Sequence, residues 1–175
     1  MKTYAILLRG VTPTGKNKVP MAELRAALTE AGLLDAQTYI QSGNVIAKSR
    51  LDHAAVQSLV HEAVVRKIGA DVAIIARTHE QLCRVMEQNP FPTEVASRTY
   101  FSSLASMPTP ALLHELLQID FSPDAVQVID DTIYTLYATK FSDSKFNNNF
   151  FERRLKVVAT TRNFNTMSRL LRLCS

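Results

Sequence analysis

Residues 37–48 read QTYIQSGNVIAK, and this stretch predicts a β-hairpin. Two runs of strand-forming residues, Gln37–Gln41 and Asn44–Lys48, flank the dipeptide Ser42-Gly43. A glycine there supplies the positive φ angle that a tight turn requires. The hairpin is the centre from which the fold of the first half of the chain can be predicted.

The pattern predicts one helix and one strand on each side of this hairpin. On the N-terminal side, the nearly continuous apolar run of Lys2–Arg9 predicts a buried strand, and a helix follows from Pro20. On the C-terminal side, residues 56–64 carry apolar side chains at helical spacing, and Asp71–Arg77 forms another apolar strand. The order βαββαβ within 77 residues is that of the ferredoxin-like fold.

The second half of the chain predicts a similar but less complete order. Helices are expected at Thr78–Gln88, Pro108–Gln118, Ser144–Leu155 and Asn165–Leu173, and strands at Arg98–Ala105, Ala125–Ile129 and Ile133–Tyr137. We therefore expect an α+β fold of two ferredoxin-like subdomains in one compact unit, residues 1–77 and 78–175, the second with extra basic C-terminal helices. Structural duplication fits this order, although no sequence repeat is evident.

The composition is typical of a globular protein in a reducing compartment. Hydrophobic residues make up 46% of the 175 residues and charged residues 21%, which excludes a disordered chain. No apolar run reaches the length of a membrane-spanning helix, and Arg9 interrupts the only stretch that resembles a signal peptide. Cys83 and Cys174 are far apart in sequence, which favours the cytoplasm over a disulfide scaffold. No metal or cofactor motif is present, and we expect a monomer or weak dimer.

Basic residues are concentrated near the C-terminus. Residues 139–175 carry eight basic and two acidic side chains, a net charge of +6, whereas residues 1–138 carry −2. A basic patch of this size attracts phosphates, nucleic acid or acidic partners. The same charges also suit an ordinary solvated helical surface.

The loop after the first strand, Gly10–Asn17, nearly matches the phosphate-binding pattern G-x4-G-K-[ST]. Asn17 replaces the hydroxyl residue, Pro13 lacks an N–H group, and the helix begins only at Pro20. These departures argue against a nucleotide phosphate loop. Two interpretations of the loop remain, a looser anion site and a solvated basic loop. The candidate ligand-binding residues of the loop are Arg9, Lys16, Asn17 and Lys18.

Two further polar clusters are candidate ligand-binding sites. The first is the hairpin tip, with Gln41, Ser42 and Asn44, although these residues also suit plain turn chemistry. The second lies near the C-terminus and comprises Lys145, Glu152, Arg153, Thr161, Arg162, Asn163 and Asn165. The planar fork of Arg162 is suited to a phosphate or carboxylate, while Asn163 or Asn165 would equally serve as a helix N-cap. Glu152 is the least poor of the few carboxylates as a general base, although no partner visible in the sequence marks any of them for that role.

Three blocks of residues carry a family resemblance. The first is Leu7-Leu8-Arg9-Gly10 with Lys16-Asn17-Lys18, Met21, Leu24-Arg25 and Leu28, and the second is Tyr39–Val45. The third is Ser144-Lys145, Asn147, Glu152-Arg153 and Leu155, followed by Thr160–Thr166. With these blocks the chain resembles the bacterial family catalogued as domain of unknown function 1697. It departs from the expected pattern at Phe164, where tryptophan is expected, and at Thr12-Pro13-Thr14, which replaces a more glycine-rich stretch. The resemblance implies two ferredoxin-like subdomains and supplies no activity.

The function expected from these clusters is binding of an anionic ligand, either a phosphorylated small molecule or nucleic acid. Two alternatives use the same residues: an enzyme acting on a phosphate-bearing substrate, and a module that docks an acidic protein partner. The fold does not decide among them, because ferredoxin-like sheets support all three. The first hypothesis requires that polar clusters far apart in sequence come together in space.

Overall fold

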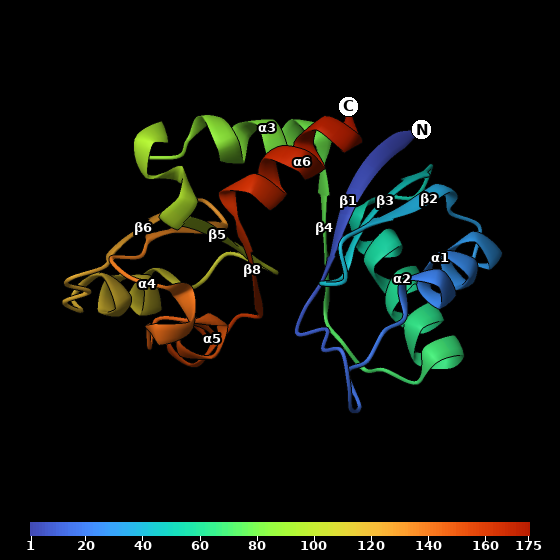
Figure 1. Ribbon diagram of the computed structural model, residues 1–175, viewed down its shortest axis with the longest axis horizontal. Coiled ribbons are helices and arrows are strands. Elements are labelled where there is room, and N and C mark those ends of the chain that lie inside the picture. The colour runs from blue at the N-terminus through green and yellow to red at the C-terminus, as the bar shows by residue number, and fades with distance from the viewer. The chain divides into compact units, whose positions relative to one another are not determined.

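The chain forms two compact units in the computed structural model, which describes residues 1–175 (Figure 1). Unit 1 comprises Met1–Arg84 together with Arg169–Ser175, and unit 2 comprises Val85–Ser168. The expectation that residues 1–77 and 78–175 are separate subdomains stays a prediction.

Unit 1 is a four-stranded antiparallel sheet covered by helices. Its elements are β1 (Lys2–Leu8), α1 (Met21–Glu30), β2 (Leu34–Tyr39), β3 (Asn44–Ser49), α2 (His53–Ile68), β4 (Ile74–Thr78) and the start of α3 (His79–Glu87). The strands lie in the order β2-β3-β1-β4. Alternate residues of β1, Tyr4, Ile6 and Leu8, share a core with Leu24 of α1 and Val60 of α2. Both helices therefore pack on the same face of the sheet.

Unit 2 repeats this architecture. A short 3-10 helix (Thr93–Arg98) leads into β5 (Thr99–Leu104), α4 (Pro110–Leu117), β6 (Ala125–Ile129), β7 (Thr132–Leu136), α5 (Asn148–Leu155), β8 (Ala159–Asn163) and the start of α6 (Phe164–Cys174), with a second 3-10 turn at Phe141–Asp143. The strand order is β6-β7-β5-β8. Leu104, Leu116, Tyr137 and Phe151 lie in its core. The predicted fold class, two ferredoxin-like subdomains, is confirmed.

Strand β8 is the element that the sequence analysis missed. Residues 160–163 were expected to lead into the last helix, but they pair antiparallel with β5, with Arg162 opposite Phe101. Thr160 and Arg162 are buried, whereas Thr161 is only partly buried. Polar residues therefore occupy buried strand positions here, which hides the usual alternation of apolar and polar residues.

The strand registers reveal an internal repeat. Arg77 lies opposite Ala5 in unit 1, just as Arg162 lies opposite Phe101 in unit 2. With this alignment, Lys2-Thr3-Tyr4 corresponds to Arg98-Thr99-Tyr100. The two halves thus share a recognisable sequence once their strands are superposed by register.

Backbone contacts follow the same repeat. Leu8 N donates to Gly43 O, and Leu104 N donates to Asp131 O, each at 2.8 Å. Helix α3 is capped by Thr78, whose Oγ1 accepts from Gln81 N at 3.3 Å. The equivalent helix α6 is capped by Asn163, whose Oδ1 accepts from Thr166 N at 2.8 Å. Asn163 is therefore an N-cap, one of the two roles that its sequence context allowed.

Several element boundaries differ from the sequence prediction by a few residues, and two of these differences have a visible cause. The expected helix Ser144–Leu155 begins at Asn148, because the Asn147 side chain accepts from Phe150 N at 3.1 Å and caps it. The expected strand Gln37–Gln41 is Leu34–Tyr39 instead, because Ile40 takes a φ of 52° and starts the turn. No helix of the chain combines the length and the apolar character needed to cross a membrane.

The buried thiol of Cys174 makes unit 1 sensitive to alkaline pH. Burial raises the pKa of Cys174 from 9.0 to about 11. Between these values the unfolded chain releases the thiol proton and the folded chain keeps it, so stability present below pH 9 is lost as the pH rises. We expect Cys174 to contribute a loss of about 2 kcal/mol in unfolding free energy across this range.

Urea titrations of wild type and Cys174→Ala at both ends of the range measure this difference. An unchanged pH slope in Cys174→Ala would contradict it.

Candidate functional site

In unit 1, the first loop and the hairpin tip lie against each other. Gly43 in the tip has a φ of +80° and accepts a hydrogen bond from Leu8 N. A Cβ atom at Gly43 would come within 2.8 Å of both Leu8 Cβ and Val11 Cγ2. The close packing of the hairpin on the start of the loop therefore requires glycine at position 43. Two of the three polar clusters are thus brought together within one unit.

The loop itself is closed by its own hydrogen bonds. Thr12 N donates to Asn17 O at 3.1 Å, and Lys18 N donates to Gly15 O at 3.2 Å. Asn17 Nδ2 donates to Gly10 O at 3.3 Å. These N–H groups are engaged inside the loop, so they do not form the backbone cradle of a phosphate loop. The side chains of Lys16 and Lys18 in this loop are exposed.

A depression of about 510 Å³ lies between this loop and the hairpin tip. Its lining residues are Val11, Thr12, Pro13, Lys18, Val19, Pro20, Ile40, Gln41 and Ser42. Most of them are apolar, and Lys18 is the one cation. Asn44 is buried, and its Nδ2 donates to Tyr39 O at 3.1 Å and to Ser42 Oγ at 3.0 Å. Asn44 therefore stabilises the turn, as plain turn chemistry predicts.

In unit 2, a second depression lies at the start of α5. It has a volume of about 710 Å³ and is lined by Lys145, Asn147, Asn149, Glu152 and Arg153. Lys145 and Arg153 are both exposed. Lys145 Nζ lies 5.2 Å from the Phe146 ring centroid, and Arg153 Nε donates to Asn149 O at 3.3 Å. Every residue of this lining is polar or charged.

Glu152 links α5 to β8. Its Oε1 accepts from Ala159 N at 2.9 Å. This bond fixes the helix that carries Arg153 against the neighbouring strand. It gives Glu152 a structural role, whereas a general base needs a carboxylate directed at the substrate.

The remaining C-terminal candidate residues lie on β8 and α6 and do not line the depression. Thr161 Oγ1 donates to Asn148 Oδ1 at 2.5 Å and is 2.7 Å from Ser102 Oγ. Arg162 is buried, and its Nη1 donates to Thr160 Oγ1 at 2.8 Å and to Thr161 O at 2.9 Å. Burial lowers the pKa of Arg162 to about 10, so the guanidinium stays protonated at neutral pH. Asn165 is exposed on α6.

The structure thus brings the candidates together in two groups. Lys18, Gln41 and Ser42 share the depression in unit 1, and Lys145, Glu152 and Arg153 share the one in unit 2. Arg9 is half-buried after β1, while Arg162 is buried on β8. The meeting of all three clusters stays a prediction, and so does a binding role for Arg9, Thr161, Arg162 or Asn165. No group of three or more His, Cys, Asp or Glu side chains is placed to hold a metal ion.

Sequence analysis missed Asn149 of the unit 2 depression and did not predict the N-cap role of Asn147. The signal was the capping pattern, in which an asparagine precedes the first helical turn by one residue. It also missed the pair His79 and Cys83, whose Nε2 and Sγ atoms are 3.3 Å apart on α3. That pair is visible in sequence as two residues four apart on a predicted helix.

Comparison with known proteins supports the fold and adds no activity. A family model described as "Protein of unknown function (DUF1697)" matches residues 1–134. A solved structure, the conserved bacterial protein SP0830 from Streptococcus pneumoniae, superposes with a TM-score of 0.73 at 24% sequence identity. The match covers 99% of this chain and 98% of that one. None of the curated proteins matches the chain.

Proposed function

Because the chain belongs to this family of proteins of unknown function, its activity has to be inferred from its own residues, and we propose that it binds a phosphate-bearing ligand at the start of α5. The observation that carries this proposal is the 710 Å³ depression with two exposed cations and two amide side chains. Its volume is in the range of small-molecule sites. The guanidinium of Arg153 offers a planar fork and the ammonium of Lys145 a point charge, which together suit a phosphate group.

The surroundings of the depression favour an anion as well. It lies where α5 begins, and the N-terminus of a helix has a positive potential. The segment from residue 139 to 175 has a net charge of +6, so the wider field has the same sign. The depression of unit 1 is less suitable, because apolar residues form most of its lining and it contains one cation.

A thermal-shift panel of phosphate, pyrophosphate, nucleotides, sugar phosphates and short DNA and RNA tests the proposal. A selective ligand at 100 times its dissociation constant raises the unfolding free energy by about 2.7 kcal/mol. We expect Lys145→Ala and Arg153→Ala each to weaken binding by about tenfold, because each removes a hydrogen bond to a charged group. Lys140→Ala is the matched control, since Lys140 is exposed and does not line the depression.

The control decides between a site and a general charge effect. Equal losses in Lys140→Ala and Lys145→Ala would contradict a defined site, and so would the absence of any stabilising anion. An affinity that falls steeply as the salt concentration rises indicates many phosphate contacts and would identify nucleic acid as the ligand. A shallow dependence on salt would identify a small molecule.

Glu152→Gln separates binding from catalysis. Glutamine can still accept from Ala159 N, so the change removes a negative charge and keeps the bond that holds α5. Binding of a phosphate should strengthen by about threefold, because one like charge in the depression is removed. If Glu152 were instead a general base, turnover of a phosphate-bearing substrate would be lost while binding remained.

A further inference from the structure

Helix α3 begins with a histidine and a cysteine whose reactive atoms are in contact. His79 Nε2 lies 3.3 Å from Cys83 Sγ, one helical turn further along. Cys83 is a free, half-buried thiol. His79 also lines a cavity of about 520 Å³; Cys83 is not one of its lining residues and adjoins it through the contact with His79.

The hydrogen bonding of His79 favours one tautomer. Its Nδ1 atom is buried without a hydrogen-bond partner. A buried N–H without an acceptor costs more than a buried nitrogen lone pair, so the proton belongs on Nε2. Nε2–H then donates to Cys83 Sγ, and a donated hydrogen bond stabilises a thiolate more than a thiol.

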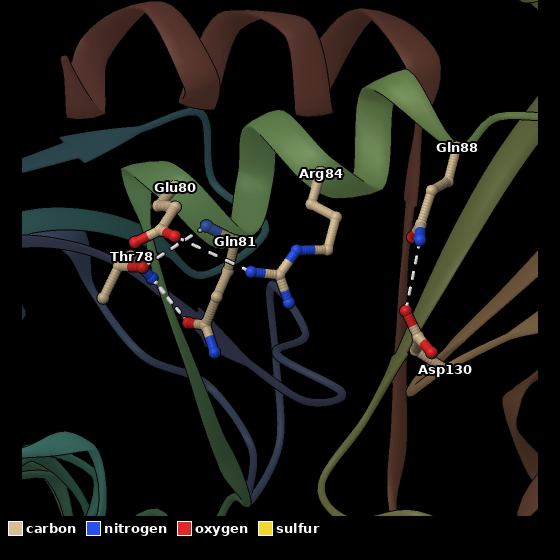
Figure 2. A network of polar contacts seen from close by, with 6 residues as sticks. All are labelled: Thr78, Glu80, Gln81, Arg84, Gln88 and Asp130. Atoms are coloured by element: carbon tan, nitrogen blue, oxygen red, sulfur yellow. Dashed lines mark hydrogen bonds and ion pairs between the residues drawn. The ribbon is translucent and has the colours of Figure 1, made fainter.

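The cavity that His79 lines has two cationic side chains, Lys2 and Arg84. Glu80 is its one acidic residue. Figure 2 shows Gln81 and Arg84 on the same side of α3. Arg84 reaches Glu80 only through a long contact of 3.7 Å, and both side chains are mostly exposed. A pair of this kind is weak, so Arg84 can turn toward an anion in the cavity.

We propose that Cys83 is a reactive thiol that exchanges with anionic low-molecular-weight disulfides, with His79 as its positioning residue. Glutathione disulfide is the probe, because its carboxylates suit Lys2 and Arg84. The Cys83 thiolate attacks one sulfur of the probe, and the probe's S–S bond breaks. The products are a mixed disulfide on Cys83 and a glutathione thiolate, which takes up the proton that Cys83 released.

Cys174 provides an internal comparison. It is the cysteine that lines the cavity, but only 1% of its surface is exposed and its Sγ donates to Thr3 O at 3.5 Å. Burial raises its pKa to about 11, which keeps it a thiol. A buried thiol of this kind is unreactive in the folded protein.

Intact-protein mass spectrometry after incubation with glutathione disulfide tests the proposal. We expect one adduct on the folded wild type, none on Cys83→Ser, and the same rate in Cys174→Ser as in the wild type. Cys83 should react faster in the folded protein than in the urea-unfolded chain, where it lies beside no fixed imidazole. A folded-state rate at or below the unfolded rate, or an adduct on Cys174, would overturn the proposal.

Two variants identify the groups that act on the thiol. His79→Phe should slow exchange by about three- to tenfold, since it removes a hydrogen bond to a charged sulfur. Phenylalanine suits this helix start, because the repeat places Phe164 at the equivalent position of α6. Arg84→Ala should slow the exchange with glutathione disulfide and leave the rate of exchange with the uncharged bis(2-hydroxyethyl) disulfide unchanged. Unaltered rates in His79→Phe, or equal slowing of both disulfides in Arg84→Ala, would remove the assigned roles.

Discussion

Replacing Phe151 by alanine is expected to lower the free energy of unfolding by about 3–5 kcal/mol, because it empties a fully buried aromatic position. Phe151 has 0% of its surface exposed and lies in the core of unit 2. Its ring lies 5.6 Å from that of Phe150 on the same helix. Since α5 also carries Asn149 and Arg153, a loosened helix should bind anions less tightly as well.

Urea denaturation followed by circular dichroism measures this loss. Leu117→Ala is the control, because Leu117 belongs to the same unit and is 49% exposed. An exposed substitution of this kind changes stability by about 0.5 kcal/mol or less. Similar losses in the two variants would mean that Phe151 does not anchor α5 in the core.

Gly43→Ala is expected to lower the free energy of unfolding by about 2–5 kcal/mol. The left-handed φ of +80° accounts for about 1–2 kcal/mol of this, since a Cβ atom disfavours that region. The contacts of 2.8 Å with Leu8 Cβ and Val11 Cγ2 add an overpacking cost of about 1–3 kcal/mol. Leu8 is fully buried in the core of unit 1, so neither it nor the hairpin can move aside freely.

Gly15→Ala is the matched control for this substitution. Gly15 has a φ of +78°, but nothing lies within 4 Å of the position of its Cβ atom. It therefore carries the backbone cost alone, about 1–2 kcal/mol. The difference between the two variants, measured by urea denaturation, isolates the close approach of the hairpin tip to the first loop. Equal losses would show that the two segments do not pack as described.

The fold could be predicted from the sequence wherever local pattern and burial agree. The apolar runs of β1 and β4 and the helical spacing of α2 each pointed to the observed element. The strand β8 could not be predicted, because Thr160, Thr161 and Arg162 are polar and their burial depends on pairing with β5, about sixty residues earlier. The repeat was hidden for a similar reason, since its few shared residues become visible only through the strand registers.

The candidate site was predicted in part. Lys145 and Arg153 could be found as cations in a basic segment, and both lie in the depression at α5. The N-cap role of Asn147 was missed because the predicted helix began too early, although asparagine is a favoured N-cap. Asn17 and Asn44 were candidate ligand-binding residues, and both donate to backbone carbonyls of their own turns. A sequence shows which polar groups are available, whereas the fold determines which of them the backbone uses first.

The most direct test of the proposed function is an NMR titration of the ¹⁵N-labelled protein with pyrophosphate. We predict saturable shift changes at the backbone amides of residues 145–153, and their loss in the double variant Lys145→Ala/Arg153→Ala. Saturable changes confined to residues 10–18 and 40–44, or no saturable change in any amide, would contradict an anion site at the start of α5.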